Sequence, residues 1–495
     1  MIRRSLLRKF TGVRLSDEES RIFASFLEAS DGMGKGTVLR AAGGWVRDKI
    51  LGIESHDIDI ALDNVPGDEF ARYVHDREHN SGKISSIGVV KENPDQSKHI
   101  RTATFRFHGF DIDMNNLRSE TYTQDSRIPE VQFAKHPSED ALRRDFTINA
   151  LYYNINTREI EDFTGSGLSD LEQGIIRTPL PAARTFVDDP LRALRAIRFA
   201  ARLGFALHED ILKAWTRDDV RVGLLNKVSR ERVGIEVTKM MKDENRFEAV
   251  SLLHRSGLLK LLLEPPEDQG APSLSGVSAR DYSEWKAATI LVNEAESDDI
   301  NFDEILTRLE SLDIVSLSEE KKTLLSYCIL FLGAFRGRKT PSPSVVARLS
   351  MKLPSTDSKA IGSVLSSLKP LDGLLNDFSA GALVGENAAI AFGRIIRGPL
   401  QEMFPCALRL ATAHLEEDLG RDLLRKVESL LDEFSLRDCH KWKPVVDGSE
   451  LCRVFSIKPG PIIQKLLSVE FDLMFKGERD RDTLIAAMQL KLGEQ

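Results

Sequence analysis

The chain has 495 residues, of which 41% are hydrophobic, and a formal net charge of −8 at pH 7. A chain of this length can form several hydrophobic cores. No apolar run approaches the roughly 20 residues of a membrane-spanning helix, so we do not expect a membrane protein. The negative charge disfavours blanket attraction to a polyanion, so any nucleic-acid contact must use local basic surface. The four cysteines are widely spaced without a CxxC pattern, which speaks against a zinc ribbon or a disulfide framework.

The N-terminal segment is basic and amphipathic. Five basic residues precede the first acidic residue, Asp17, and they are interleaved with apolar side chains. This composition resembles a mitochondrial presequence. The alternative is a basic first helix that packs on the domain following it.

A glycine turn is predicted between a strand over residues 37–42 and a helix over residues 45–51. The turn contains Gly43 and Gly44, whose lack of a Cβ lets the backbone approach a ligand closely. The N-terminal amides of the helix can receive a phosphate group. A glycine pair alone would be a weak signal.

A second strand is predicted over residues 55–62, with Asp57 and Asp59 on one face and isoleucines on the other. Two neighbouring carboxylates suit Mg²⁺, which also takes water and substrate phosphate oxygens as ligands. Alternating polar residues equally fit a solvated strand face. The glycine turn just upstream favours a metal pair that bridges to a nucleoside triphosphate.

A helix with an arginine stripe is predicted to open at residues 188–190. The stripe follows at i, i+3 spacing, with one further arginine a turn on, and consists of Arg192, Arg195, Arg198 and Arg202. A solvated helix face is one interpretation. The other interpretation is that the helix recognises a nucleotide base. Cytosine and adenine present an amino donor beside a ring-nitrogen acceptor, whereas uracil and guanine present a carbonyl acceptor beside an N–H donor. A carboxylate beside a guanidinium therefore accepts C and A and refuses U and G.

The fold class is predicted as α+β, with all-helical segments after a mixed head. We expect a head with a small mixed β-sheet at residues 20–178, which ends at a proline-rich break. A helical neck at 179–264, a helical body at 279–435 and a small helical tail at 436–495 follow. A proline-rich linker separates the neck from the body.

Six stretches occur in one order along residues 43–234: GGWVRD with SHDIDIAL, LRSETYT, SRIPEV, RRDFTINALYYNINT, DDPLRALRAIRFAARLGF and SRERVG. Together they resemble the class II tRNA nucleotidyltransferases, the CCA-adding enzymes of the polymerase-β-like superfamily, in their eukaryotic, fungal-like form. Bacterial-type poly(A) polymerases share the first stretch. The resemblance implies that the head is catalytic and that the neck recognises the base.

The activity implied by the resemblance is Mg²⁺-dependent addition of C, C and A to the 3′ end of tRNA, from CTP and ATP, without a nucleic-acid template. Asp57 and Asp59 are expected to be the catalytic metal ligands, and Gly43, Gly44 and Arg47 to position the triphosphate. Three alternatives remain: a partial CC-adding or A-adding enzyme, a poly(A) polymerase of the same superfamily, or a non-catalytic tRNA-binding relative. The intact carboxylate pair argues against the last.

Residues 143–150 carry ribose chemistry in the resembling family. By that analogy Asp145 accepts a hydrogen bond from a ribose 2′-hydroxyl, and Arg144 and Asn149 support the sugar and phosphates. The alternative is a local ion-pair cluster of Arg143, Arg144 and Asp145 at a helix start.

By the same resemblance, Asp189 and Arg192 are expected to select the base, and Arg195 is expected to position the incoming triphosphate. The family more often has Glu where this chain has Asp188. That departure leaves Asp189 and Arg192 in place.

Two further features follow from the resemblance. Related transferases often have a third carboxylate, for which Asp111 and Asp113 are candidates at i, i+2 on a predicted strand. The polar residues 115–137 correspond to the family's flexible loop, associated with the switch from adding C to adding the final A.

The expected partners are tRNA, through its acceptor and T stems, together with CTP and ATP. The tail is expected to bind tRNA, and the protein to be a monomer. Family members often serve mitochondria as well as nucleus and cytosol, so we expect localisation to the mitochondrion and to the cytoplasm or nucleus.

Overall fold

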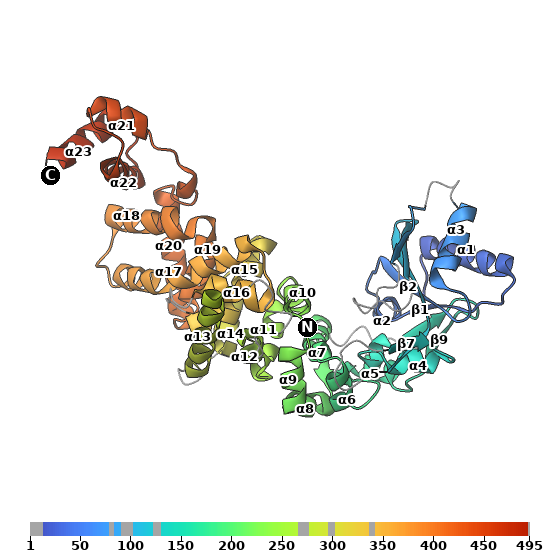
Figure 1. Cartoon of the computed structure of the whole chain (residues 1–495). Helices are drawn as coiled ribbons and strands as arrows, with labels where there is room; N and C mark the ends of the chain where they lie inside the picture. Colours follow the sequence, from blue (N-terminus) through green and yellow to red (C-terminus); the bar gives the residue numbers. More distant parts are fainter. Residues whose placement is uncertain are drawn as a thin grey trace. The chain divides into compact units, whose positions relative to one another are not determined.

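The computed structural model describes residues 13–78, 84–90, 102–121, 130–265, 277–295, 302–335 and 342–493. The chain forms two compact units, which meet in sequence between Glu236 and Val237 (Figure 1). Most of the predicted presequence, the centre of the predicted loop and most of the predicted linker lie outside the described residues. In Figure 1 the long strands belong to the blue-to-teal part of the chain, and the part from yellow to red is helical.

A seven-stranded sheet forms the centre of the first unit, in the order β3-β4-β5-β2-β1-β8-β9. Only the β2–β5 pair is parallel within it. The strands are β1 (Leu39–Ala42), β2 (Asp57–Leu62), β3 (Gly88–Val90), β4 (Thr102–Phe107), β5 (Phe110–Asn116), β8 (Leu151–Asn154) and β9 (Glu159–Asp162). A separate antiparallel hairpin consists of β6 (Arg118–Thr121) and β7 (Glu130–Phe133).

Helices accompany the sheet and then replace it. Those before and between the strands are α1 (Asp17–Met33), α2 (Gly44–Leu51), α3 (Gly67–Glu78) and α4 (Pro137–Leu142). After the sheet come α5 (Gly167–Gln173), α6 (Ala182–Asp188), α7 (Leu191–Leu203), α8 (Glu209–Trp215), α9 (Asp218–Asn226) and α10 (Arg230–Met241). Helix α1 starts at a capping box in which Ser16 and Glu19 satisfy each other's backbone amides.

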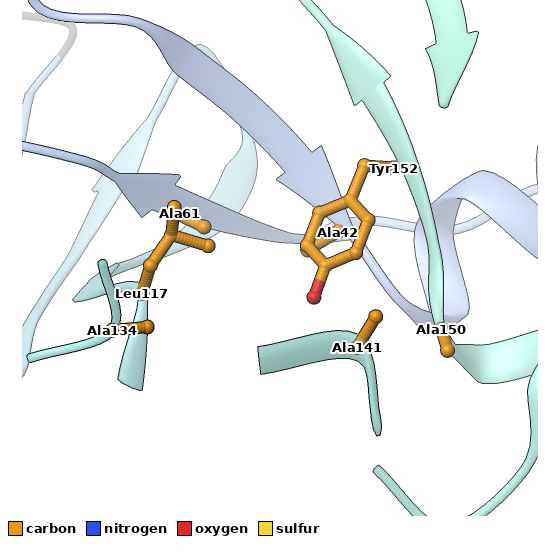
Figure 2. Packing of buried hydrophobic residues seen from close by; sticks show 7 residues of the cluster. All are labelled: Ala42, Ala61, Leu117, Ala134, Ala141, Ala150 and Tyr152. Carbon is orange, nitrogen blue, oxygen red and sulfur yellow. The ribbon is translucent and has the colours of Figure 1, made fainter. Parts of the chain in front are cut away.

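A cluster of small buried residues lies where β1, β2 and β8 approach α4 (Figure 2). Five of its seven members are alanines, and Leu117 and Tyr152 complete it. The ring of Tyr152 extends from β8 toward Ala141 of α4. Small side chains let these elements pack closely, and this close packing brings α4 beside the strands that carry the predicted site.

The second unit is helical throughout its described part. Its helices are α11 (Arg246–Arg255), α12 (Leu258–Leu263), α13 (Ala279–Ala295), α14 (Phe302–Ser311), α15 (Glu319–Phe335), α16 (Pro343–Met351), α17 (Ser355–Ser379), α18 (Gly385–Ile395), α19 (Phe404–Thr412), α20 (Glu417–Glu433), α21 (Gly448–Val454), α22 (Pro461–Phe475) and α23 (Arg481–Gly493). No helix in the described ranges combines the length and apolar composition needed to cross a bilayer.

The predicted fold class, a mixed sheet with helices followed by a largely helical remainder, is confirmed. One prediction about the neck is wrong in detail, because the neck contains a short strand. This strand, β11 (Ala206–Leu207), pairs in parallel with β10 (Ile175–Ile176). The left-handed Gly204 ends α7 and turns the chain back, so that the Ala206 amide donates to the Gly174 carbonyl at 2.8 Å.

The predicted boundaries of the head, neck, body and tail stay predictions. The division between the two compact units falls inside α10, and therefore within the predicted neck. Helix α7 begins one residue after Pro190, which is its N-cap, and Asp188 ends α6. The predicted helix start at residues 188–190 is thus a junction between two helices.

Candidate active site

Carboxylates from two neighbouring strands lie side by side near the middle of the sheet. The parallel register of β2 and β5 places Asp57 opposite Asp111 and Asp59 opposite Asp113. Asp57 and Asp59 are exposed, and the isoleucines that alternate with them are buried, as the sequence pattern predicts. All four carboxylates share one face of the sheet, because alternate side chains of a strand point the same way.

The pKa of Asp59 is raised above its ordinary value. The side chain reaches solvent within a pocket, yet crowding by protein atoms removes much of its hydration, and this is the largest cause of the shift. The Arg144 guanidinium acts in the opposite direction, whereas the like charges of Asp113 and Asp57 raise the pKa further. A bound cation would offset that repulsion.

The donor set fits a metal ion that arrives with a triphosphate. Within the described ranges, no group of three or more His, Cys, Asp and Glu side chains could by itself hold a metal ion. Two carboxylates on one strand face are nevertheless sufficient for Mg²⁺ when water and phosphate oxygens complete its octahedral shell. Asp113 is steadied by Thr104, whose hydroxyl donates to its Oδ1 at 2.6 Å.

The turn between β1 and α2 favours glycine at its first position. Gly43 is the N-cap of α2 and has φ 71° and ψ −125°. A Cβ there would lie 2.8 Å from Nη1 of Arg144. Glycine is therefore required by the backbone conformation, and a side chain here would also displace the Arg144 guanidinium.

A chain of hydrogen bonds joins α2 to residues 143–150. The Arg47 side chain is nearly buried, and its Nε donates to Oδ1 of Asp48 at 2.7 Å. Arg47 also donates from Nη1 to Oδ1 of Asn149. Asn149 in turn donates from Nδ2 to Oδ1 of Asp145 at 3.1 Å. The predicted phosphate turn and the predicted ribose segment are thereby parts of one network.

Asp140 is a buried hub that was not predicted from the sequence. Its Oδ1 accepts from Nη2 of Arg143 at 2.5 Å, and its Oδ2 accepts from Nη2 of Arg144 at 3.1 Å and from the Tyr152 hydroxyl at 2.5 Å. Burial raises the pKa of Asp140, but the Arg144 and Arg143 guanidiniums outweigh it and hold the pKa well below its usual range. The i, i+3 and i, i+4 spacing to the two arginines was the available signal. The local ion-pair cluster thus exists, with Asp140 in place of Asp145.

Asp145 has all its acceptor positions occupied. Its Oδ1 accepts from the Phe146 amide at 2.8 Å and from Asn149, and its Oδ2 accepts from Nε and Nη2 of Arg195 at 2.8 and 2.6 Å. Burial would raise the pKa of Asp145, but the Arg195 charge and these hydrogen bonds lower it to about 2. An ionised carboxylate has about four lone-pair sites, so this group is fully engaged.

The arginine stripe of α7 is largely engaged rather than solvated. Arg195 and Arg198 both contact Glu236 of α10, with Nε of Arg198 2.6 Å from Oε2. Two guanidiniums lie over the ring of Phe199, with Arg198 4.2 Å and Arg47 5.0 Å from its centroid. The SRERVG stretch ends just before Glu236, but neither Glu236 nor Phe199 was assigned a role from the sequence.

The two residues expected to read the base do not pair with each other in this structure. Oδ2 of Asp189 lies 2.9 Å from Nη2 of Arg232, a residue of α10. Arg192 donates from Nη2 to the carbonyl oxygen of Arg143 at 2.6 Å. Arg232 belongs to the SRERVG stretch, which carried the family resemblance without an assigned role.

A pocket of about 670 Å³ brings these residues together. Nine arginines and five acidic residues are among those that line it. Of the predicted site residues, the pocket contains Gly43, Gly44, Arg47, Asp59, Arg144, Asp145, Asn149, Asp189, Arg192 and Arg195. Asp57 lies two residues before Asp59 on the same face of β2, and the candidate third carboxylates lie beside them on β5. The surplus of guanidiniums suits a polyanionic ligand such as a triphosphate.

The head sheet, its carboxylates and the arginine pocket define a nucleotidyltransferase. The sequence profile described as "Poly A polymerase head domain" matches residues 39–177, and that described as "Probable RNA and SrmB- binding site of polymerase A" matches residues 204–268. The mitochondrial CCA tRNA nucleotidyltransferase of Saccharomyces cerevisiae is 33% identical over 86% of this chain and 83% of its own length. The tRNA nucleotidyltransferase cca1 of Schizosaccharomyces pombe is 33% identical over 96% of both chains. This chain belongs to the family of class II CCA tRNA nucleotidyltransferases.

Solved structures agree on the fold. The Thermotoga maritima CCA-adding enzyme complexed with tRNA superposes with a TM-score of 0.62, at 22% identity, over 97% of both chains. CCA-adding enzymes solved with ATP and with CTP give TM-scores of 0.61 and 0.58, each at 20% identity over 97% of this chain and 96% of theirs. The family resemblance predicted from the sequence is confirmed.

The predicted tail is a small helical unit with its own core. Val446, Leu451 and Leu466 of this core pack against Leu484 and Met488 of α23. It also contacts α18, because Arg394 donates from Nε to Asp472 of α22 at 2.8 Å, and a Cβ at Gly393 would lie 2.5 Å from the Phe475 ring. Lys443, Lys458 and Lys465 are exposed on this unit.

Proposed function

We propose that the protein adds C, C and A in turn to the 3′ end of tRNA, using CTP and ATP, with Mg²⁺ as the cofactor. The observation that carries the proposal is that a single pocket contains Asp59 of the carboxylate face, Arg195 of the arginine stripe, and the expected base readers Asp189 and Arg192. The names of the full-length fungal relatives and of the solved complexes support the same substrates.

The triphosphate would lie among the guanidiniums of Arg47, Arg144 and Arg195, next to the glycine turn. Arg144 is held by Asp140, and Arg195 by Asp145, so their charges are fixed before the ligand arrives. Such preorganised charge stabilises a phosphoryl-transfer transition state without reorganisation during the reaction. Mg²⁺ held by Asp57 and Asp59, when bound, would lower the pKa of the attacking 3′-hydroxyl and neutralise the leaving pyrophosphate.

Base choice would rest on the protein. Asp189 offers carboxylate oxygens to the amino group of cytosine or adenine, and Arg192 offers N–H donors to the adjacent ring nitrogen. Uracil and guanine place a carbonyl and an N–H at those positions, so each contact would leave a buried polar group unpaired, at a cost of about 1 to 3 kcal/mol. Asn149 and Arg144 would complete the nucleotide-binding set around the sugar and phosphates. Asp145, whose acceptor positions are all occupied, would act by holding Asn149 and Arg195 in place, and a direct hydrogen bond from the ribose 2′-hydroxyl would require one of these contacts to open.

The tRNA would be bound by basic surface of the helical parts and of the tail, since the net charge of −8 rules out attraction by bulk charge. The match of residues 204–268 to a profile for a probable RNA-binding site supports an RNA contact in the neck. A double location in mitochondrion and cytoplasm or nucleus stays a prediction. The name of the mitochondrial S. cerevisiae relative supports only the mitochondrial part of this prediction. Most of the N-terminal residues that bear on it lie outside the described ranges.

Three transcripts of one tRNA test the proposal: one lacking the 3′ CCA, one ending in C and one ending in CC. Each is incubated with the protein, Mg²⁺, CTP and ATP, and the product ends are sequenced. Complete CCA on all three supports the proposal. Products that stop at CC identify a CC-adding enzyme, addition only to the CC-ending transcript identifies an A-adding enzyme, and A tracts identify a poly(A) polymerase. If none of the three transcripts gains a nucleotide, the proposed catalytic activity is contradicted.

A further inference from the structure

We propose that Arg232 is a positioning residue for base selection that acts by holding the Asp189 carboxylate. The inference rests on the proposed function, because Asp189 selects a base only if the pocket takes nucleoside triphosphates. Arg232 lies on α10, more than forty positions along the chain from Asp189. Both side chains line the same pocket.

The contact is a direct ion pair between Nη2 of Arg232 and Oδ2 of Asp189 at 2.9 Å. The Asp189 side chain is 18% exposed and that of Arg232 is 39% exposed, so the pair sits at the pocket wall rather than in the core. The other carboxylate oxygen, Oδ1, accepts from the Leu191 amide at the longer distance of 3.3 Å. Arg232 is therefore the stronger of these two restraints.

Arg192 does not supply this restraint in the structure. Its guanidinium donates to the Arg143 carbonyl, and its backbone amide contacts Asp189 through the carbonyl oxygen, at 3.0 Å. Each expected base reader is thus held by a different group. Arg232 holds the acceptor and the Arg143 carbonyl holds the donor.

A held carboxylate can still read a base. An ionised carboxylate has about four lone-pair sites, and Arg232 and the Leu191 amide occupy two of them. The remaining sites can accept the amino group of cytosine or adenine. Without Arg232, the long hydrogen bond from the Leu191 amide would restrain the carboxylate only weakly, and the carboxylate could rotate away from the amino group. Selection against uracil and guanine would weaken while the triphosphate contacts stayed in place.

The test compares kcat/KM for all four triphosphates in wild type, Arg232→Ala and Arg232→Lys on a tRNA lacking CCA and on one ending in CC. We expect Arg232→Ala to lower the CTP-over-UTP and ATP-over-GTP preferences by about tenfold, the worth of one charge-assisted hydrogen bond. Arg232→Lys should restore part of the preference, because the ammonium keeps one charged donor. If the alanine variant does not fold, the proposal requires that Arg232→Lys by itself shows a weaker CTP-over-UTP and ATP-over-GTP preference than wild type. Arg184→Ala, an exposed arginine on α6 outside the pocket, is the matched control.

A double-mutant cycle with Asp189→Asn separates positioning from direct contact. If Arg232 acts through Asp189, the double variant has the same base preference as Asp189→Asn alone. Equal reductions of kcat/KM for all four triphosphates, or additive reductions of preference, would overturn the proposal. Failure of wild type to use CTP and ATP would instead contradict the proposed function.

Discussion

Arg195 of α7 donates two hydrogen bonds to one carboxylate oxygen of Asp145, from Nε at 2.8 Å and from Nη2 at 2.6 Å. The pair joins the helix that bears the arginine stripe to the segment between α4 and the sheet. Asp145 is 9% exposed and the Arg195 side chain is 30% exposed, so this is a partly buried ion pair with additional hydrogen bonds.

The first prediction concerns pH and the free energy of unfolding. The pKa of Asp145 is lowered to about 2 in the folded protein, below its value of 3.8 in an unfolded chain. Its ionisation therefore contributes stability that is fully present above pH 3.8 and is lost as the pH falls toward 2. Asp145→Asn should lower the free energy of unfolding by about 2 kcal/mol near neutrality. Urea titrations should show this difference shrinking below about pH 4, and a pH-independent difference would contradict the assignment.

The second prediction concerns the carboxylate face. Asp57→Ala and Asp59→Ala should each lower incorporation at least about a thousandfold, because each removes a metal ligand worth several kcal/mol of transition-state stabilisation. Affinity for tRNA, measured by filter binding, should stay within a few fold because little surface is removed. Glu172→Ala, an exposed acidic residue of α5, is the control. Normal turnover in either aspartate variant would refute the catalytic assignment.

A third prediction uses stability as a readout of the metal site. The pKa of Asp59 is raised in the folded protein, so its ionised form is disfavoured by folding, and neutralising it removes that cost. Asp59→Asn should therefore melt slightly higher than wild type in EDTA. With Mg²⁺ and a non-hydrolysable triphosphate analogue, wild type should gain stability and the variant should gain less. Equal gains in both proteins would show that Asp59 does not bind the metal.

A fourth prediction concerns base choice. Asp189→Ala combined with Arg192→Ala should admit UTP and GTP. In wild type each mismatched contact of a wrong base with one of these side chains costs about 1 to 3 kcal/mol, and the double variant makes neither contact. A selection of a hundredfold or more should fall toward equality. Competition assays with mixed triphosphates measure this directly. Strict selection of C and A in the double variant would show that these residues do not serve as the protein template.

The fifth prediction concerns tRNA binding by the tail. Deleting residues 441–495 should weaken tRNA binding and flatten its salt dependence, while incorporation at saturating tRNA persists. Each phosphate that the shortened protein no longer neutralises should reduce the slope by about 0.9 log units per log unit of salt. Because the tail packs on α18, a gentler variant is also needed, in which Lys443, Lys458 and Lys465 are changed to Gln. An unchanged slope in both proteins would limit the tail to a structural role.

Local patterns predicted the part of the site that depends on neighbouring residues. The alternation at Asp57 and Asp59 and the turn at Gly43 follow from strand geometry and from glycine's lack of a Cβ. The family predicted from the six ordered stretches and the fold class predicted from the periodicity of the chain are confirmed. The parallel register that sets Asp113 beside Asp59 depends on long-range strand pairing, which one sequence does not reveal.

The contacts between distant segments were not predictable in the same way. The Asp189–Arg232 pair and the contacts of Glu236 with Arg195 and Arg198 join α10 to residues about forty positions earlier. No periodicity encodes such a pairing. Only the helix packing that forms the pocket brings these side chains together.

The most direct test of the central claim is a crystal structure of the protein with Mn²⁺ and a non-hydrolysable CTP analogue, with anomalous data to place the metal. We predict a metal bound by Asp57 and Asp59 and by phosphate oxygens, with the cytosine edge against Asp189 and Arg192. A metal bound away from β2, or a base that points away from α7, would contradict the account.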